Sequence, residues 1–268
     1  MVSLFTDVGR RVNRNRLILM KVGFTALALF GAPFHKIIKK ACEDRFDAVE
    51  LLCEGPYLPR HALRNLSQFE IAFQYDIELT LHSPTVDLNP ASVNIGIREE
   101  TARQLKETVD LAAAIGASTI TTHPGYVKRI NDELTKRSKT LALQSLDKWA
   151  DYATDVGLIP AIENMPRNPK YFCTDAAEHR FFVTSCGAFA TIDIGHAHTN
   201  SSVKDFLHLD FPIAYFHVSD NDGERDLHLT IGEGTIDWSQ LKGIRKAIIE
   251  VNDYAGVKQS RDRLTSDV

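Results

Sequence analysis

Short apolar segments and longer amphipathic segments alternate along this chain from residue 21 to its end. The apolar segments are KVGFTAL (21–27), DAVELL (47–52), ELTLHS (78–83), TITTHP (119–124), IPAIEN (159–164), FATIDI (189–194), IAYFHV (213–218) and AIIEV (247–251). Their length and their β-branched residues predict eight β-strands. The clearest amphipathic segments, residues 98–116 and 132–157, each end at a glycine and predict helices between strands. Strands that are separated by helices favour parallel pairing in an α/β fold.

Eight such strands in roughly 250 residues match the size of a TIM barrel. A doubly wound open sheet is the structural alternative, but no glycine-rich phosphate-binding turn follows the first strand. No linker interrupts the series. The sequence therefore predicts one domain over residues 20–268, a single (β/α)8 barrel whose strand interiors are apolar.

Two regions depart from this regular pattern. Only IDWSQLKGIRK precedes the eighth strand, which predicts a short helix ending at Gly243, and the last helix, within 253–268, is also short. Residues 1–19 carry four arginines and one aspartate and lack the long apolar centre of a secretory signal. We expect them to form a flexible extension before Met20, with a transit peptide as the alternative.

Composition narrows the classes of partner. The net charge of −4 gives no overall attraction to nucleic acid or to an anionic membrane. No run of apolar residues approaches the roughly 18 that a membrane span needs. The four cysteines are scattered and form no CxxC pair, which is typical of a reducing compartment. We therefore expect a cytoplasmic protein without disulfides.

Polar residues gather where the predicted strands end. In a TIM barrel these ends meet at one face, and the loops that follow them build the active site. The residues at that face are His82, His123, Glu163, Asp193, His196, His217 and Glu250, together with Asp226 and His228 in the loop after the seventh strand. All nine are side-chain types that bind zinc, manganese, magnesium or cobalt.

Each of these residues has a simpler explanation when it is considered singly, because a histidine that ends a strand is often only hydrogen-bonded. However, five of the ten histidines fall on this one rim. Burying so many carboxylates together would be costly without a cation. The pattern therefore predicts a divalent metal site of one to three ions, under a loop that glycines 232 and 234 allow to fold over it.

Six segments carry a family resemblance: LTLHSP, TTHPG, AIENMP, IDIGHAH, FHVSD and DLHLTIGEGTIDW. They resemble, in the same order, motifs of the xylose-isomerase-like TIM barrels, from about residue 20 to residue 252. That superfamily includes metal-dependent sugar isomerases and epimerases, and the family-2 apurinic-site endonucleases of the endonuclease IV type.

The resemblance implies two ligand arrangements. In the isomerase branch one metal would be held by Glu163, Asp193, His217 and Glu250, and the two glutamates would also be the catalytic acid and base. In the endonuclease branch three zinc ions would be bound. Their ligands would be His82, His123 and Glu163 for the first, the four isomerase ligands for the second, and His196, Asp226 and His228 for the third.

We favour an isomerase or epimerase that acts on a small sugar or sugar phosphate through an enediolate. The alternative is an apurinic-site endonuclease that cleaves DNA, and a metal-binding barrel without catalytic activity is the third reading. A DNA-binding barrel needs basic loops, yet CEGPYLPRH and residues 84–98 supply one arginine each. Only MPRNPKYF is both basic and aromatic, and Arg167 within it is a candidate to bind the substrate's phosphate or hydroxyl.

Overall fold

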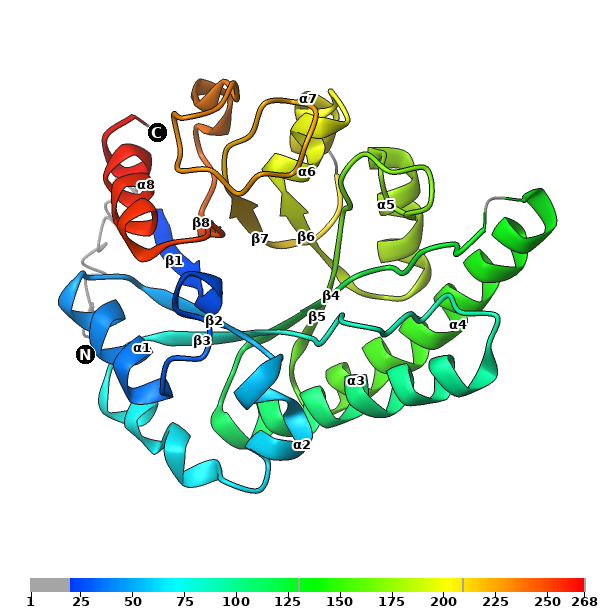
Figure 1. Cartoon of the computed structure of the whole chain (residues 1–268), viewed down its shortest axis with the longest axis horizontal. Coiled ribbons are helices and arrows are strands. Elements are labelled where there is room, and N and C mark those ends of the chain that lie inside the picture. The colour runs from blue at the N-terminus through cyan, green and yellow to red at the C-terminus, as the bar shows by residue number, and fades with distance from the viewer. Residues whose placement is uncertain (1–19, 130, 209, 268) are drawn as a thin grey trace, which may run out of the picture.

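Eight parallel strands close into a barrel in the computed structural model, which describes residues 20–129, 131–208 and 210–267 (Figure 1). The strands are β1 (Lys21–Thr25), β2 (Ala48–Leu52), β3 (Glu78–His82), β4 (Thr119–Thr122), β5 (Ile159–Glu163), β6 (Phe189–Asp193), β7 (Ile213–Val218) and β8 (Lys246–Ile249). All eight predicted strands are confirmed. The expected extension at residues 1–19 lies outside the described residues.

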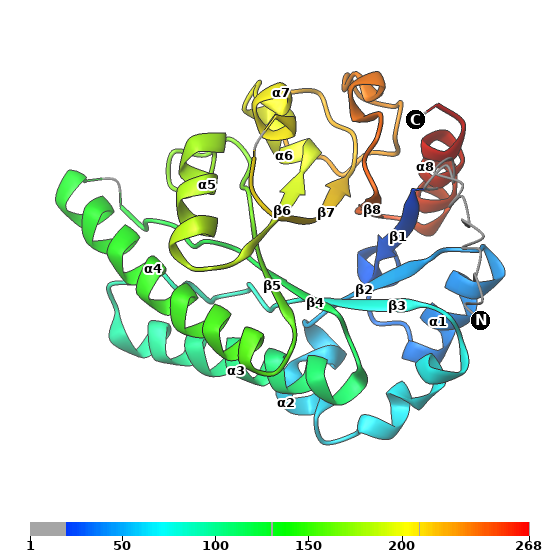
Figure 2. The same cartoon turned by 180° about the vertical axis from the view of Figure 1, so that it is seen from behind.

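The pairing of β1 with β8 closes the sheet, with Val22 opposite Ala247 and Phe24 opposite Ile249. An open, doubly wound sheet is thereby excluded, and the predicted (β/α)8 barrel is confirmed. Helices surround the strands on the outside, as the views from opposite sides show (Figures 1 and 2). Within the described residues, no helix is long and apolar enough to cross a membrane.

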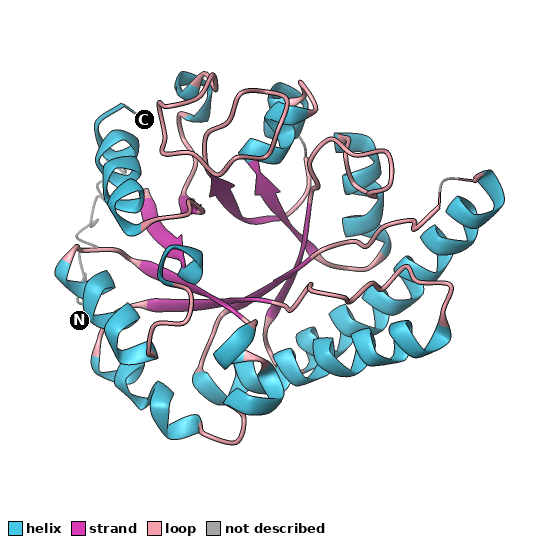
Figure 3. Ribbon diagram, in the orientation of Figure 1, coloured by secondary structure: helices cyan, strands magenta, loops and turns pink. Residues whose placement is uncertain are grey.

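The helical elements differ greatly in length (Figure 3). The α-helices are α1 (Phe34–Glu43), α2 (Pro59–Ala62), α3 (Ile95–Ile115), α4 (Asp132–Asp155), α5 (Ala176–Ser185), α6 (Ile194–Thr199), α7 (Val203–Leu207) and α8 (Tyr254–Asp267). The 3-10 helices are η1 (Ala26–Leu29), η2 (Gly55–Tyr57), η3 (Leu66–Gln74) and η4 (Trp238–Leu241).

Capping residues set the ends of the two longest helices. The Asn94 side chain accepts a hydrogen bond from the Gly96 amide, so α3 begins three residues before the predicted start at 98. Gly116 ends α3 with a φ of 72°, the left-handed conformation that glycine adopts most easily. Asn131 caps α4 by accepting from the amides of Glu133 and Leu134.

The segment between β7 and β8 lacks the α-helix that usually follows a barrel strand. The expected short helix is the 3-10 helix η4, which ends before Gly243, and the rest of the connection is loop. This loop contains Asp226 and His228. The segment between β7 and β8 therefore places polar side chains at the rim and adds no α-helix to the outer layer of the barrel.

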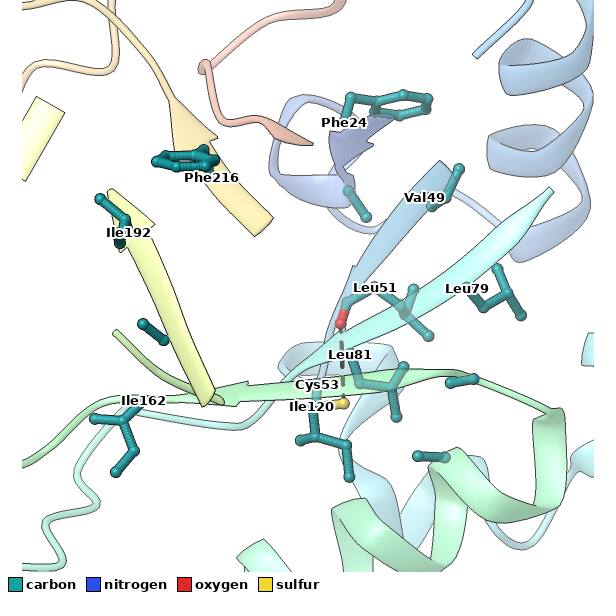
Figure 4. Close-up of a cluster of buried hydrophobic side chains, with 14 of the residues drawn as sticks. Phe24, Val49, Leu51, Cys53, Leu79, Leu81, Ile120, Ile162, Ile192 and Phe216 are labelled. Carbon is teal, nitrogen blue, oxygen red and sulfur yellow. Dashed lines mark hydrogen bonds between the residues drawn. The ribbon is translucent and has the colours of Figure 1, made fainter. Parts of the chain in front are cut away.

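Alternate strand residues divide the barrel into two layers. Phe24, Val49, Leu51, Leu81 and Ile120 are buried in the large apolar cluster (Figure 4). The residues between them on the strands face the barrel interior, where many are polar: Thr25, Glu50, Thr80, Thr121 and Thr191 are all fully buried. The expectation of an apolar strand interior was therefore wrong for this layer.

Gly23 in β1 is packed so closely that a larger side chain would not fit. A Cβ atom at Gly23 would lie 2.6 Å from the Ala48 carbonyl oxygen and 2.7 Å from Ile248 Cδ1. We expect Gly23→Ala to lower the free energy of unfolding by about 1–3 kcal/mol, the usual cost of overpacking, as measured by denaturant titration. Gly96→Ala is the matched control, because its Cβ would meet only Asn94 Oδ1, at 3.5 Å. Equal stabilities of the two variants would contradict the packing described for β1.

Candidate metal centre

The nine residues predicted at the rim all lie at the carboxyl ends of the strands or in the segments that follow them, where His196 is part of α6. His82, Glu163 and Asp193 are the last residues of β3, β5 and β6. The structure brings the nine residues into three sets: His82, His123 and Glu163; Glu163, Asp193, His217 and Glu250; and His196, Asp226 and His228. Within each set the candidate ligand atoms lie within 4.8 Å of one another.

The central set consists of Glu163, Asp193, His217 and Glu250, and its three carboxylates surround one ring nitrogen of His217. Its Nδ1 lies 2.8 Å from Glu163 Oε1, 3.1 Å from Glu250 Oε2 and 4.0 Å from Asp193 Oδ2. These three carboxylates come from different strand ends. Asp193 Oδ2 is buried and has no hydrogen-bond partner, so one of its oxygens remains free to bind a cation.

Two further sets flank the central one. Glu163 Oε2 lies 3.2 Å from His82 Nε2 and 3.2 Å from His123 Nε2, so this carboxylate is shared between two sets. Asp226 Oδ2 lies 3.2 Å from His196 Nε2 and 3.1 Å from His228 Nε2. Asp226 Oδ1 is buried without a partner, like Asp193 Oδ2.

Backbone carbonyls orient three of the rim histidines. The Nδ1 atoms of His82, His196 and His228 contact the carbonyl oxygens of Ser83, Asn164 and Glu250 at 2.9, 2.7 and 2.8 Å. Because a carbonyl only accepts, each Nδ1 carries the proton, and each Nε2 faces its set. Metal-binding histidines are held in the same way in known sites.

His217 is oriented by a residue that the sequence reasoning missed. Glu50, on β2, accepts a hydrogen bond from His217 Nε2 at 2.8 Å, and both side chains are fully buried. A sequence signal existed, since a glutamate interrupts the otherwise apolar strand AVELL.

Asp220 and two glycines shape the loop that carries Asp226 and His228. The Asp220 carboxylate accepts from the Gly232 amide at 2.7 Å and from Trp238 Nε1 at 3.0 Å. A Cβ atom at Gly234 would lie only 2.3 Å from Asp220 Oδ1. Gly232 has a φ of 86°. The predicted use of these glycines, to let the loop fold back over the barrel, is consistent with this geometry.

The rim concentrates negative charge, and the pKa values of four of its five histidines are raised by the nearby carboxylates, whereas burial lowers the pKa of His123. Burial lowers the pKa of His82, but the hydrogen-bonded Glu163 outweighs this effect and raises it to about 9. Burial likewise opposes the raised pKa of His228, which Asp226 and Glu250 bring to about 10. Burial raises the pKa of Asp193 to about 6. A divalent cation would take the place of the histidine protons in neutralising these carboxylates.

The donor atoms fit such a cation. Nitrogen and carboxylate oxygen donors are the ligands of zinc and manganese, and the buried Asp193 Oδ2, which has no hydrogen-bond partner, lies 4.0 Å from His217 Nδ1 in the central set. The residues that would hold a metal are therefore present, pre-oriented and close together, whereas the metal's identity is not determined by the donor set.

A cavity of about 270 Å³ opens onto this rim, and His82, His196, His228 and Glu250 are among its lining residues. A second cavity of about 190 Å³ adjoins it and shares Thr85, His123, Met165 and Tyr171 with it. A larger cavity of about 610 Å³ beside β7 contains none of the nine residues. The rim cavity is therefore the candidate substrate site.

Arg167 does not line the rim cavity, although its neighbour Pro166 does. Its side chain is exposed, and its backbone amide donates to Thr199 Oγ1 at 2.9 Å. The role suggested for Arg167 in substrate binding stays a prediction, and this geometry offers it no support.

Comparison with known proteins identifies a family with the same barrel fold. A family model for the xylose isomerase-like TIM barrel matches residues 38–257. The chain belongs to this family. Two uncharacterized proteins of Methanocaldococcus jannaschii in the curated set are similar to it: MJ1311 is 28% identical, with 83% of this chain and 78% of the relative covered, and MJ1614 is 30% identical, with 77% and 79% covered.

Several solved structures are also similar to this chain. A D-tagatose 3-epimerase-like protein is 27% identical with a TM-score of 0.78, covering 91% of this chain and 96% of its own. The TTHB071 protein from Thermus thermophilus, soaked with ZnCl2, is 19% identical with a TM-score of 0.73, and 92% and 97% of the two chains are covered. A D-psicose 3-epimerase is 18% identical with a TM-score of 0.70, and 93% and 91% are covered.

Metal removal tests the candidate centre. We expect chelator-treated protein to unfold about 5–10 °C below protein reloaded with excess Mn2+ or Zn2+, because a cation that binds only the folded state stabilises it. Differential scanning calorimetry measures the shift. Asp193→Asn, which removes a charge from the central set, should reduce the shift strongly. Identical melting temperatures with and without metal would contradict a metal centre at this rim.

Proposed function

We propose that this protein is a divalent-metal-dependent isomerase or epimerase that acts on a small sugar or sugar phosphate. The observation that carries the proposal is the convergence of Glu163 and Glu250 on one point. Their carboxylates come from β5 and from the end of β8, and they lie 2.8 and 3.1 Å from the same His217 nitrogen. A pair of carboxylates beside one cation site is suited to removing a proton from a carbon next to a carbonyl group. The proton can then be returned to the other face of that carbon, or to the carbonyl carbon.

The two glutamates occupy different environments, as an acid–base pair requires. The Glu163 side chain is only 2% exposed and contacts His82, His123 and His217, whereas the Glu250 side chain is 13% exposed. Both glutamates line the cavity. One carboxylate would remove the carbon-bound proton and the other would return it. A bound divalent cation would stabilise the negative charge that develops on the substrate oxygens.

The cavity supports a small substrate. Its volume of about 270 Å³ lies just below the range of drug-sized ligand pockets, about 300–1,000 Å³. Similarity to the D-tagatose 3-epimerase-like protein points to ketoses as the first compounds to test. The proposed reaction is therefore either inversion of configuration at the carbon next to the ketose carbonyl, or a shift of the carbonyl group to that carbon.

Proton transfer leaves an isotopic signature. We expect metal-loaded protein incubated in D2O with D-tagatose, D-psicose or a ketose phosphate to place solvent deuterium at the carbon next to the carbonyl, as measured by NMR and mass spectrometry. Glu163→Gln should lower this rate at least about 100-fold, because it removes a catalytic carboxylate. The exposed Glu70 supplies the control Glu70→Gln, which should retain the full rate. Full exchange by Glu163→Gln would contradict the proposed roles.

A second candidate function rests on the set formed by His196, Asp226 and His228, which we call the outer set. His196, Asp226 and His228 complete the three sets of a trinuclear phosphoesterase, whose three cations would serve cleavage at apurinic sites in DNA. The segment 84–98, which is a loop followed by the first turn of α3, is unfavourable to this candidate, because it exposes Val86, Val93 and Ile95 at 67%, 46% and 61%. A DNA backbone needs cationic contacts, so this candidate ranks second.

His228→Ala separates the two functions. It removes a ligand from the outer set and leaves the central set intact. If the protein is an isomerase with one essential cation, deuterium exchange should stay within about 10-fold of the wild-type rate. If it is a phosphoesterase, cleavage of abasic-site DNA should fall about 100-fold or more, because losing a ligand costs at least as much as losing a residue that only orients one. Parallel initial-rate assays on both substrates measure the difference.

A further inference from the structure

Glu50 is a fully buried carboxylate that belongs to none of the three candidate metal sets. It lies in the middle of β2, and its side chain points into the barrel interior, where it contacts two side chains of β7. His217 Nε2 lies 2.8 Å from Glu50 Oε1, and the Tyr215 hydroxyl donates to Glu50 Oε2. A buried carboxylate is costly unless its partners are fixed, so these two contacts account for its presence.

The ring of His217 separates Glu50 from the central set. Its Nε2 contacts Glu50, and its Nδ1 faces Glu163, Glu250 and Asp193. Because a carboxylate only accepts, the proton on Nε2 is donated to Glu50. Nδ1 also contacts carboxylates and therefore carries a proton in this structure. A cation in the central set would replace that proton and bind the Nδ1 lone pair, while Nε2 keeps its hydrogen bond to Glu50.

Glu50 is itself held by a hydrogen-bonded network across the barrel. Thr121 Oγ1 lies 2.6 Å from the Tyr215 hydroxyl and 2.7 Å from Thr191 Oγ1. Since the Tyr215 O–H donates to Glu50, Thr121 donates to the Tyr215 oxygen. The network joins β2, β4, β6 and β7, so the position of the Glu50 carboxylate depends on four strands and not on a flexible loop.

This arrangement differs from that of the other oriented rim histidines. His82, His196 and His228 donate to neutral backbone carbonyls, whereas His217 donates to a charged carboxylate. A carboxylate partner increases the electron density on the opposite nitrogen and makes it a better ligand than a carbonyl partner does.

We propose that Glu50 is the positioning residue of the central metal set. It holds His217 with Nε2 protonated and Nδ1 directed at Glu163, Asp193 and Glu250, and Tyr215 holds Glu50 in place. The proposal rests on the metal centre of the proposed function, and it concerns a residue that contacts neither substrate nor metal.

Metal affinity tests this role without any sugar substrate. We expect Glu50→Gln to weaken Mn2+ binding by about 10–100-fold in isothermal titration, the usual cost of losing such a partner. Co2+ loading provides a second readout, because a displaced His217 should change the visible absorption of bound cobalt. Glu78→Gln is the matched control. Glu78 is also a barrel carboxylate, but it is the first residue of β3, at the end away from the rim. It contacts Lys246 and Ser118, so this variant should bind Mn2+ like the wild type.

Tyr215→Phe provides a milder variant in case Glu50→Gln fails to fold. It removes only the hydroxyl that donates to Glu50 and keeps the ring, so we expect Mn2+ affinity to fall several-fold. Nitrogen-15 NMR of labelled histidine in the zinc-loaded protein should find the His217 proton on Nε2. A proton on Nδ1, or unchanged Mn2+ affinity in folded Glu50→Gln or Tyr215→Phe, would overturn the proposal.

The outcomes separate this proposal from the proposed function. If the wild type binds Mn2+ and Glu50→Gln binds it more weakly, the positioning role stands even if no sugar is turned over. If sugar exchange proceeds with metal and Glu50→Gln binds Mn2+ normally, the function stands and the positioning role fails. A wild-type protein that binds no divalent metal would overturn both.

Discussion

The arrangement of the rim depends on the buried carboxylate of Glu163. One of its oxygens contacts His82 and His123, and the other contacts His217. A carboxylate with 2% side-chain exposure is stable only if positive charge surrounds it. Burial alone would raise the pKa of Glu163, but His217, His123 and His82 hold it well below its usual value. The same histidines stand at the ends of β3, β4 and β7, so Glu163 links three strand ends.

Barrel closure makes this convergence possible. The pairing of β1 with β8 turns eight strand ends into a ring, so residues more than 80 positions apart, such as His82 and Glu163, come into contact. The outward strand residues pack against the helices, whereas the inward layer carries Glu50, Thr121 and Tyr215. The barrel interior is therefore an extension of the polar site and not only a packed core.

Much of this arrangement could be predicted from the sequence. All eight strands follow from short apolar runs, and the shared position of Glu163 in two sets followed from the family resemblance. The polar interior could not be predicted, because a short buried run does not show which residues face inward until closure fixes the register. Glu50 is the one charged residue in the strand AVELL, which is a sequence signal, but only the closed barrel shows that it faces His217. The start of α3 at Ile95 depends on the Asn94 cap, a local hydrogen bond that the amphipathic pattern does not encode.

The central claim is that the strand ends form a divalent metal centre at Glu163, Asp193, His217 and Glu250. Anomalous diffraction from crystals grown with Mn2+, collected above and below the manganese absorption edge, tests it most directly. The account predicts a strong anomalous peak bound by these four side chains, with His217 Nδ1 as the nitrogen ligand. Manganese bound elsewhere, with His217 Nδ1 still hydrogen-bonded to Glu163, would contradict it.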